Sequence, residues 1–84
     1  MEHETYFYKI NDININGYYR IFIKTNDIEE TNDVLIKFED NKFYDAISGE
    51  QWSNNDIETI KLQMHLHNDN NTNSCYVKLI KKLK

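Results

Sequence analysis

The sequence predicts a small all-β domain whose strands are mostly antiparallel. Apolar and polar residues alternate with a period of two along most of the chain, which is typical of half-buried strands. Asn, Asp, Ser and two glycines separate these segments, while six Tyr, four Phe and one Trp provide material for a core. We therefore expect about six short strands in meander order, forming either a sheet or a partly closed barrel, with residues 1–84 as one domain.

The first two strands are expected to form a hairpin. Residues 6–10 alternate and place Tyr6, Tyr8 and Ile10 on one face. Asn16-Gly17 is the strongest turn signal in the chain, because both residues tolerate the positive φ of a type I′ turn. A two-residue loop there places Ile10 opposite Ile23, and residues 26–33 then form a polar connection to the third strand.

Two further turns organise the middle of the chain. Val34, Ile36 and Phe38 alternate with more polar residues and predict the third strand. Asp40-Asn41 turns this strand into residues 43–47. Ser48-Gly49-Glu50 is a second hairpin-type turn, which returns the chain through residues 51–53.

The segment 56–67 is compatible with either a strand or a helix. Ser53 and Asp56 have the spacing of a capping box, which favours a helix and an α+β fold. As a strand, however, the segment places Ile60, Leu62, Met64 and Leu66 on one side, whereas a helix separates the two leucines from the other apolar residues. We favour the strand, paired across the loop 68–73 with a last strand containing Cys75.

The charges are distributed unevenly along the chain. The local net charge is −8 from Asp27 to Glu58 and +4 from Lys61 to Lys84, with a neutral N-terminal part, and these sum to the total of −4. A dense negative block favours basic partners and a basic tail favours acidic ones. The lone Cys75 and the absence of a long apolar run suggest a protein of the reducing cytoplasm, with no membrane span.

No motif in the chain predicts catalysis, a cofactor or a metal site. His65 and His67 would share one face of a strand, but a third ligand would have to come from His3, Cys75 or a carboxylate. Cys75 is expected on an apolar face, where a free cysteine serves as a small hydrophobe. The two glycines are far apart, so there is no phosphate-binding loop. We expect a protein that is not an enzyme and needs no metal or cofactor.

The acidic block gives the leading functional hypothesis. Carboxylates spaced along strands present a row of negative charge similar to a nucleic-acid backbone, and such a row suits a protein partner with a basic groove. In type, though not in any motif, a short acidic single domain resembles the anti-CRISPR and anti-restriction inhibitors of phages and mobile elements. The expected partner-binding residues are seven carboxylates with two aromatic anchors: Glu29, Glu30, Asp33, Glu39, Asp40, Asp45, Glu50, Tyr44 and Trp52.

Two alternatives stay open. Tyr18, Arg20, Phe22 and Lys24 would share one strand face. Together with the C-terminal lysines they form a mixture of rings and cations that is typical of surfaces that bind single-stranded nucleic acid. The acidity of the whole chain disfavours that alternative, because affinity for phosphates requires clustered cations. The third possibility is a structural subunit that assembles with copies of itself, as a homodimer for example.

Overall fold

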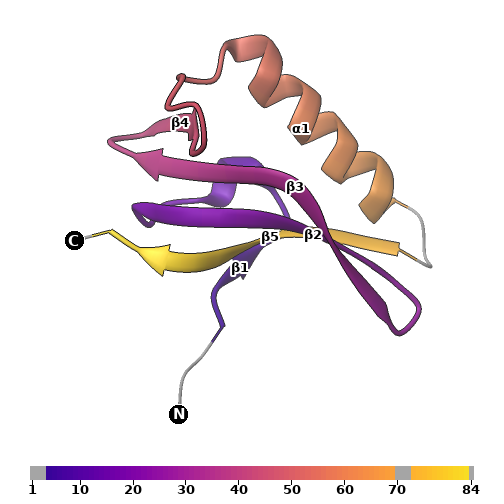
Figure 1. Ribbon diagram of the computed structural model, residues 1–84. Coiled ribbons are helices and arrows are strands. Elements are labelled where there is room, and N and C mark those ends of the chain that lie inside the picture. The colour runs from indigo at the N-terminus through magenta and orange to yellow at the C-terminus, as the bar shows by residue number, and fades with distance from the viewer. Residues whose placement is uncertain (1–3, 70–72, 84) are drawn as a thin grey trace.

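The computed structural model of the chain describes residues 4–69 and 73–83. One antiparallel sheet with the strand order β1-β5-β2-β3-β4 dominates the fold, and it does not close into a barrel (Figure 1). Its strands are β1 (Tyr6–Phe7), β2 (Gly17–Thr25), β3 (Ile28–Glu39), β4 (Lys42–Asp45) and β5 (Asn73–Lys82). The helix α1 (Asn54–Asn68) and a single 3₁₀ turn, η1 (Ile10–Asp12), pack on one face. The predicted small, mostly antiparallel β domain is confirmed, with five strands and one helix.

The turn between β3 and β4 is the one that the sequence predicts at Asp40-Asn41. Asp40 has φ 53° and Asn41 has φ 64°, and the flanking residues Glu39 and Lys42 pair with each other. Positive φ at both central residues is the signature of a type I′ turn, which matches the right-handed twist of the strands it joins. The return through residues 51–53 is a single bridge between Tyr44 and Gln51 rather than a further strand.

The predicted hairpin at Asn16-Gly17 is wrong. Gly17 begins β2, and the hairpin turn lies at Asn26-Asp27, where Asn26 has φ 56° and Thr25 pairs with Ile28. The stretch 28–33, expected to be a connection, is therefore part of β3. Polar residues dominate there because this half of the hairpin is exposed, and the alternation of apolar residues that marks a buried strand is lost.

Gly17 serves close packing rather than a turn. A Cβ atom at this position would lie 2.6 Å from the Cδ1 of Leu79 and 2.6 Å from the carbonyl oxygen of Lys81. Only glycine lets β5 approach β2 this closely.

The face predicted for residues 6–10 is only partly right. Tyr6 and Tyr8 are exposed and their rings contact each other, but Ile10 is buried in η1 and faces the core. The 3₁₀ turn rotates the chain after Tyr8, so the period of two does not continue to Ile10. Ile23 pairs with Glu30 and Cys75 instead of Ile10.

Residues 54–68 form a helix, so the favoured strand interpretation of this segment is wrong. The capping box is complete: the Asp56 backbone N–H donates to the Ser53 hydroxyl at 3.2 Å, and the Ser53 backbone N–H donates to the Asp56 carboxylate at 2.9 Å. Met64 is buried and Ile57 and Ile60 pack on the core, whereas Leu62 and Leu66 face solvent. Those two exposed leucines produced the alternation that indicated a strand.

Because α1 replaces the expected strand, β5 pairs with other segments. It lies between β1 and β2, so the last strand of the chain interrupts the meander order predicted for the first ones. Only β2, β3 and β4 follow one another as neighbours, as a meander requires.

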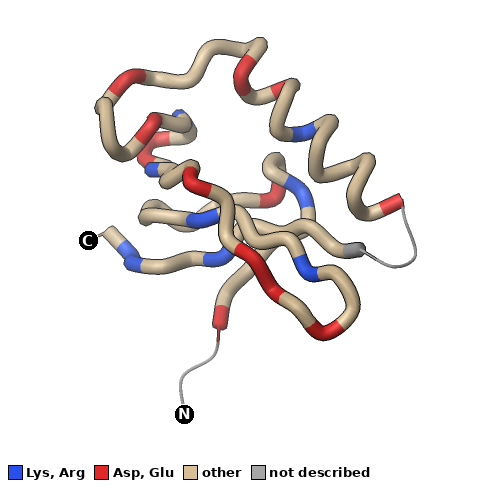
Figure 2. Tube along the Cα trace, turned by 45° about the vertical axis from the view of Figure 1, so that its right-hand side comes forward, with Lys and Arg blue, Asp and Glu red and all other residues tan. Residues whose placement is uncertain are grey.

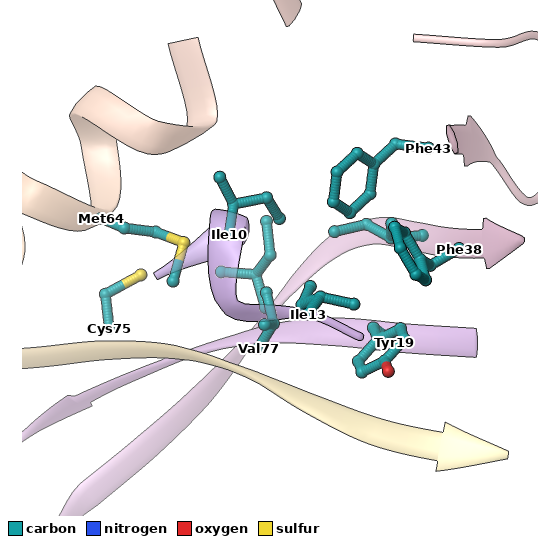
Figure 3. Close-up of a cluster of buried hydrophobic side chains, with 10 residues drawn as sticks. Ile10, Ile13, Tyr19, Phe38, Phe43, Met64, Cys75 and Val77 are labelled. Carbon is teal, nitrogen blue, oxygen red and sulfur yellow. The ribbon is translucent and has the colours of Figure 1, made fainter. Parts of the chain in front are cut away.

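The core lies between the sheet and the elements that cover it (Figure 3). Met64 points down from α1 toward Cys75 and Ile10, while Phe38 and Phe43 pack at the other end with ring centroids 4.9 Å apart. Cys75 is buried on the apolar face, as predicted. The buried residues of this core cluster are Ile10, Ile13, Tyr19, Ile21, Ile36, Phe38, Phe43, Met64, Cys75 and Val77.

Replacing Gly17 with Asn distinguishes close packing from a turn. At a type I′ turn this change would be nearly neutral, since Asn tolerates positive φ. If residue 17 instead packs against β5, the added side chain must push the backbone of β5 away. We therefore expect the free energy of unfolding, measured by urea denaturation, to fall by about 1–3 kcal/mol. Asn16→Ala is the matched neighbour and should cost less. A neutral Gly17→Asn variant would contradict the observed pairing of β2 with β5.

Candidate functional site

β3 is much longer than β4, the strand that pairs with it on the side away from β2. β4 pairs only with the segment from Ile36 to Glu39, and the Ala46 N–H donates to the Leu35 carbonyl at 2.9 Å. From Ile28 to Val34 that side of β3 has no neighbouring strand among the described residues. This segment is the free edge of the sheet, and it continues into the projecting β2–β3 hairpin (Figure 1).

Carboxylates follow this free edge, as the red segments along the projecting hairpin in Figure 2 show. Glu29 and Glu30 are consecutive on the strand, so they point to opposite faces of the sheet, where Glu29 pairs with Lys24 and Glu30 with Ile23. Asp27 precedes them in the turn, and Asp33 follows. Negative charge therefore lies on both sides of the edge.

A shallow depression on the helix side of the sheet adds three more carboxylates. It has a volume of about 300 Å³, and Val34, at the end of the free edge, forms part of its wall. Trp52 also lines it, half-buried, with its ring stacked on Phe43 at a centroid distance of 5.7 Å. We call the whole surface the acidic edge, and its carboxylates are Asp27, Glu29, Glu30, Asp33, Asp45, Glu50 and Asp56.

Some of these carboxylates already have structural roles. Asp45 accepts hydrogen bonds from the backbone N–H groups of Ile47 and Ser48, at 2.8 Å and 3.1 Å, and Asp56 caps α1. Glu29 lies 3.7 Å from the Lys78 amino group and accepts a hydrogen bond from the Tyr76 hydroxyl.

The other members are less committed. Within the described part of the chain, Asp27, Glu30, Asp33 and Glu50 have no cationic partner within 4.0 Å, and all four are exposed. They are the carboxylates of the acidic edge that are most available to a partner.

The structure divides the nine residues predicted for partner binding. Glu39 and Asp40 lie at the β3–β4 turn, at the opposite end of β3 from the hairpin tip. Glu39 is 3.3 Å from the Lys37 amino group, and Lys37 also lies over the ring of Tyr44. These three predicted residues therefore belong to a separate, partly neutralised group, whereas the other six lie on the acidic edge.

The sheet face away from α1, the outer face, carries the aromatic and basic residues of β2. Tyr18, Arg20, Phe22 and Lys24 alternate with buried residues and share this face, as the sequence predicts. Tyr76 and Lys78 of β5 complete the group. The ring of Phe22 stacks on Tyr76 at 5.8 Å, and the Lys78 amino group lies 4.5 Å above the same ring. The alternation along β5 contained this information, but only the pairing with β2 joins the two strands.

The two histidines do not form a metal site with each other. His65 and His67 are two residues apart on a helix and therefore point about 160° away from each other, so the shared face expected from a strand is lost. His65 instead lies 3.2 Å from Asp69. Residues 4–69 and 73–83 contain no group of three side chains suited to hold a metal ion. The other candidate ligand, His3, lies outside the described residues.

Comparisons with known proteins give no further information. No protein-family model, no curated protein and no solved structure matches the chain. Among the described residues, none of the helical segments has the length and apolar character needed to cross a bilayer.

Cys75 should be chemically inert while the protein is folded. Burial raises the pKa of its thiol to about 11, so about one thiol in a thousand is ionised at pH 8. We expect a disulfide reagent to modify the native protein at least a hundredfold more slowly than the urea-unfolded chain, as followed by absorbance. Equal rates in the two states would show that Cys75 is accessible in the folded protein.

Proposed function

We propose that this protein is a non-catalytic inhibitor that occupies the basic groove of a nucleic-acid-handling enzyme with its acidic edge. This is the mode of action of an anti-CRISPR or anti-restriction protein of a phage or mobile element. The observation that carries the proposal is the row of carboxylates on the free edge of β3, which includes Glu30 and Asp33 without ion-pair partners among the described residues. Such a row attracts a positively charged groove and speeds association with it.

The spacing of these charges favours mimicry of a short stretch of a single nucleic-acid strand. Asp27 to Asp33 spans about 20 Å at the rise of an extended chain. Four carboxylates lie within that length, whereas one strand of DNA carries a phosphate every 3.4 Å or so. The acidic edge therefore replaces a few phosphate contacts, and the depression beside it supplies more charge next to an apolar surface.

Trp52 gives the edge a place for an apolar contact. Its ring is fixed by stacking on Phe43, so little side-chain entropy is lost when a partner covers its exposed part. Tryptophan is also among the residues that contribute most to protein interfaces. Charge would guide the encounter, and Trp52 would add to the lifetime of the complex.

The carboxylates also have a purely structural use. An unpaired strand edge invites pairing with other chains, and charged side chains prevent it. The test must therefore separate inhibition from solubility.

The test uses a triple charge reversal on the acidic edge. Glu30→Lys, Asp33→Lys and Glu50→Lys remove exposed charges and leave the Asp45 turn and the Asp56 cap intact. Enzymes captured by the native protein from a lysate of a low-GC bacterium are purified, and their binding to labelled duplex DNA is titrated with each variant. We expect native protein to displace DNA, and the triple variant to require at least a tenfold higher concentration.

A control with the same change in net charge shows whether position matters. Asp12→Lys, Glu58→Lys and Asp69→Lys alter three exposed carboxylates away from the acidic edge. At any one salt concentration, this control should displace DNA as well as the native protein does. Its potency should also decrease with rising salt by the same factor as that of the native protein. Equal losses in both triple variants, or no displacement of DNA by the native protein, would refute the proposal.

The outer face supports a second candidate, a module that binds single-stranded nucleic acid. Phe22 stacks on Tyr76, with the Lys78 amino group above the Phe22 ring and Arg20 paired with Lys78, so rings and positive charge lie together. Tyr76 is only 7% exposed, however, so Phe22 supplies most of the ring surface that a base could reach. Against it, Glu4 and Glu29 lie 3.6 Å and 3.7 Å from the Lys78 amino group and reduce that charge.

Fluorescence anisotropy with a labelled oligo(dT) strand tests this second candidate. If the outer face binds nucleic acid, affinity should fall steeply between 20 and about 200 mM salt, and Arg20→Ala should weaken it about tenfold. Lys42→Ala, which changes an exposed lysine in the β3–β4 turn region, is the control. A flat titration at the lowest salt would exclude this candidate.

A further inference from the structure

A large groove separates α1 from the segment that joins β1 to η1. Its volume is about 770 Å³, which is within the range of pockets that hold small organic ligands. Residues of both elements line it, with Asn68 and Ser74 at one end. None of the carboxylates of the acidic edge contributes to its wall, so the groove is a separate surface.

The wall of the groove is largely apolar. Ile10 and Met64 form its floor and are almost fully buried, while Leu62 forms one side and is 57% exposed. Leu66 is one turn further along α1 and 60% exposed, so the apolar surface continues beyond the groove. An apolar surface that is continuous with a groove favours a ligand with an apolar part.

The rim of the groove carries positive charge. Lys9 comes from the β1–η1 segment and Lys61 from α1, and both line the same space. No carboxylate of the described residues lies within 4.0 Å of the Lys9 amino group. Lys61 is 3.8 Å from Glu58, but both side chains are exposed, so this contact holds Lys61 only weakly.

The remaining groups at the groove do not reverse this charge. His65 lines it and lies 3.2 Å from Asp69, and Glu58 is the carboxylate in the wall. The Asn68 side chain is occupied, because it donates to the Cys75 carbonyl at 2.9 Å and accepts from the Cys75 N–H at 2.7 Å. It forms a fixed end to the groove rather than a free polar group.

We propose that this groove binds an amphiphile with one apolar tail and one anionic head. The tail lies on Ile10, Leu62 and Met64, and the head lies between the amino groups of Lys9 and Lys61. A carboxylate or a phosphate monoester fits the head position equally well, since lysine binds both as a compact positive charge.

Titrations with matched amphiphiles test the proposal, followed by amide chemical shifts of the labelled protein. The probes are decanoate, decyl phosphate and decyltrimethylammonium, which share a ten-carbon tail and differ in the head. We expect one saturable site for the two anions, with shifts at Ile10, Leu62 and Met64, and at least tenfold weaker binding of the cation. The anion that binds with the higher affinity identifies the preferred head group.

Chain length gives an independent measure of tail burial. Each methylene that enters the groove should tighten binding about three- to fourfold from octanoate to decanoate, until the tail extends beyond the wall. A series with no dependence on length would mean that the tail stays in water, and it would overturn the proposal.

Paired variants test the head and the tail separately. Lys9→Glu with Lys61→Glu should weaken decanoate at least tenfold, whereas Lys42→Glu with Lys82→Glu, which alters two exposed lysines away from the groove, should not. Leu62→Gln should weaken it as well, with Ile47→Gln as the control at another exposed aliphatic residue. Thermal unfolding checks that each variant folds.

Three further results would overturn the proposal. Equal binding of decanoate and decyltrimethylammonium would mean that the groove selects only apolar tails. Unchanged binding by the Lys9/Lys61 variant would place the anion elsewhere. The third result is that the amphiphiles do not bind, while the apparent molar mass of the native protein rises with protein concentration and that of the Leu62→Gln variant does not. A second copy of the chain would then cover the groove instead.

Discussion

The pairing of β5 with β2 is the interaction on which the rest of the structure depends. It extends from Gly17 opposite Lys82 to Thr25 opposite Asn73, so it ties the last strand of the chain to an early one along almost its whole length. Val77 and Cys75 thereby reach the core, where Cys75 faces Met64 of α1 and Val77 lies near Ile10 and Ile13. The pairing requires a close approach of the two backbones at one end, which is possible because residue 17 has no side chain. Contacts between residues so distant in sequence are costly in chain entropy, and the buried apolar surface offsets that cost.

A single helix covers only one face of the sheet, and this asymmetry determines where binding surfaces can form. On the helix face, apolar side chains fill the space between the sheet and α1, and the groove lies between α1 and the segment that joins β1 to η1. Among the described residues, no helix covers the outer face. Its rings therefore pack against one another and against lysines, as Phe22, Tyr76 and Lys78 do, rather than forming a second core.

The ends of the sheet are protected in different ways. On one side the short β1 covers only part of β5, and the Asn68 side chain satisfies both the N–H and the carbonyl of Cys75 as a neighbouring strand would. On the other side β4 and its return segment cover the last part of β3, and the rest of β3 is left with carboxylates. Charges of this kind disfavour pairing with another strand edge, and the function that we propose uses the same charges to attract a basic partner.

The sequence by itself determined the features that depend on neighbouring residues. The turn at Asp40-Asn41, the apolar position of Cys75 and the shared face of Tyr18, Arg20, Phe22 and Lys24 follow from local conformational preferences and from the period of two. The seven predicted carboxylates were also visible, but their division between the acidic edge and the β3–β4 turn was not. Only the tertiary structure decided that residues 54–68 form a helix, that Gly17 packs rather than turns, and that β5 joins β2. In each case the deciding contact comes from a distant part of the chain: the sheet that receives Met64, and the strand that approaches Gly17. A local pattern contains no information about such contacts, because it is the same whichever segment arrives from elsewhere.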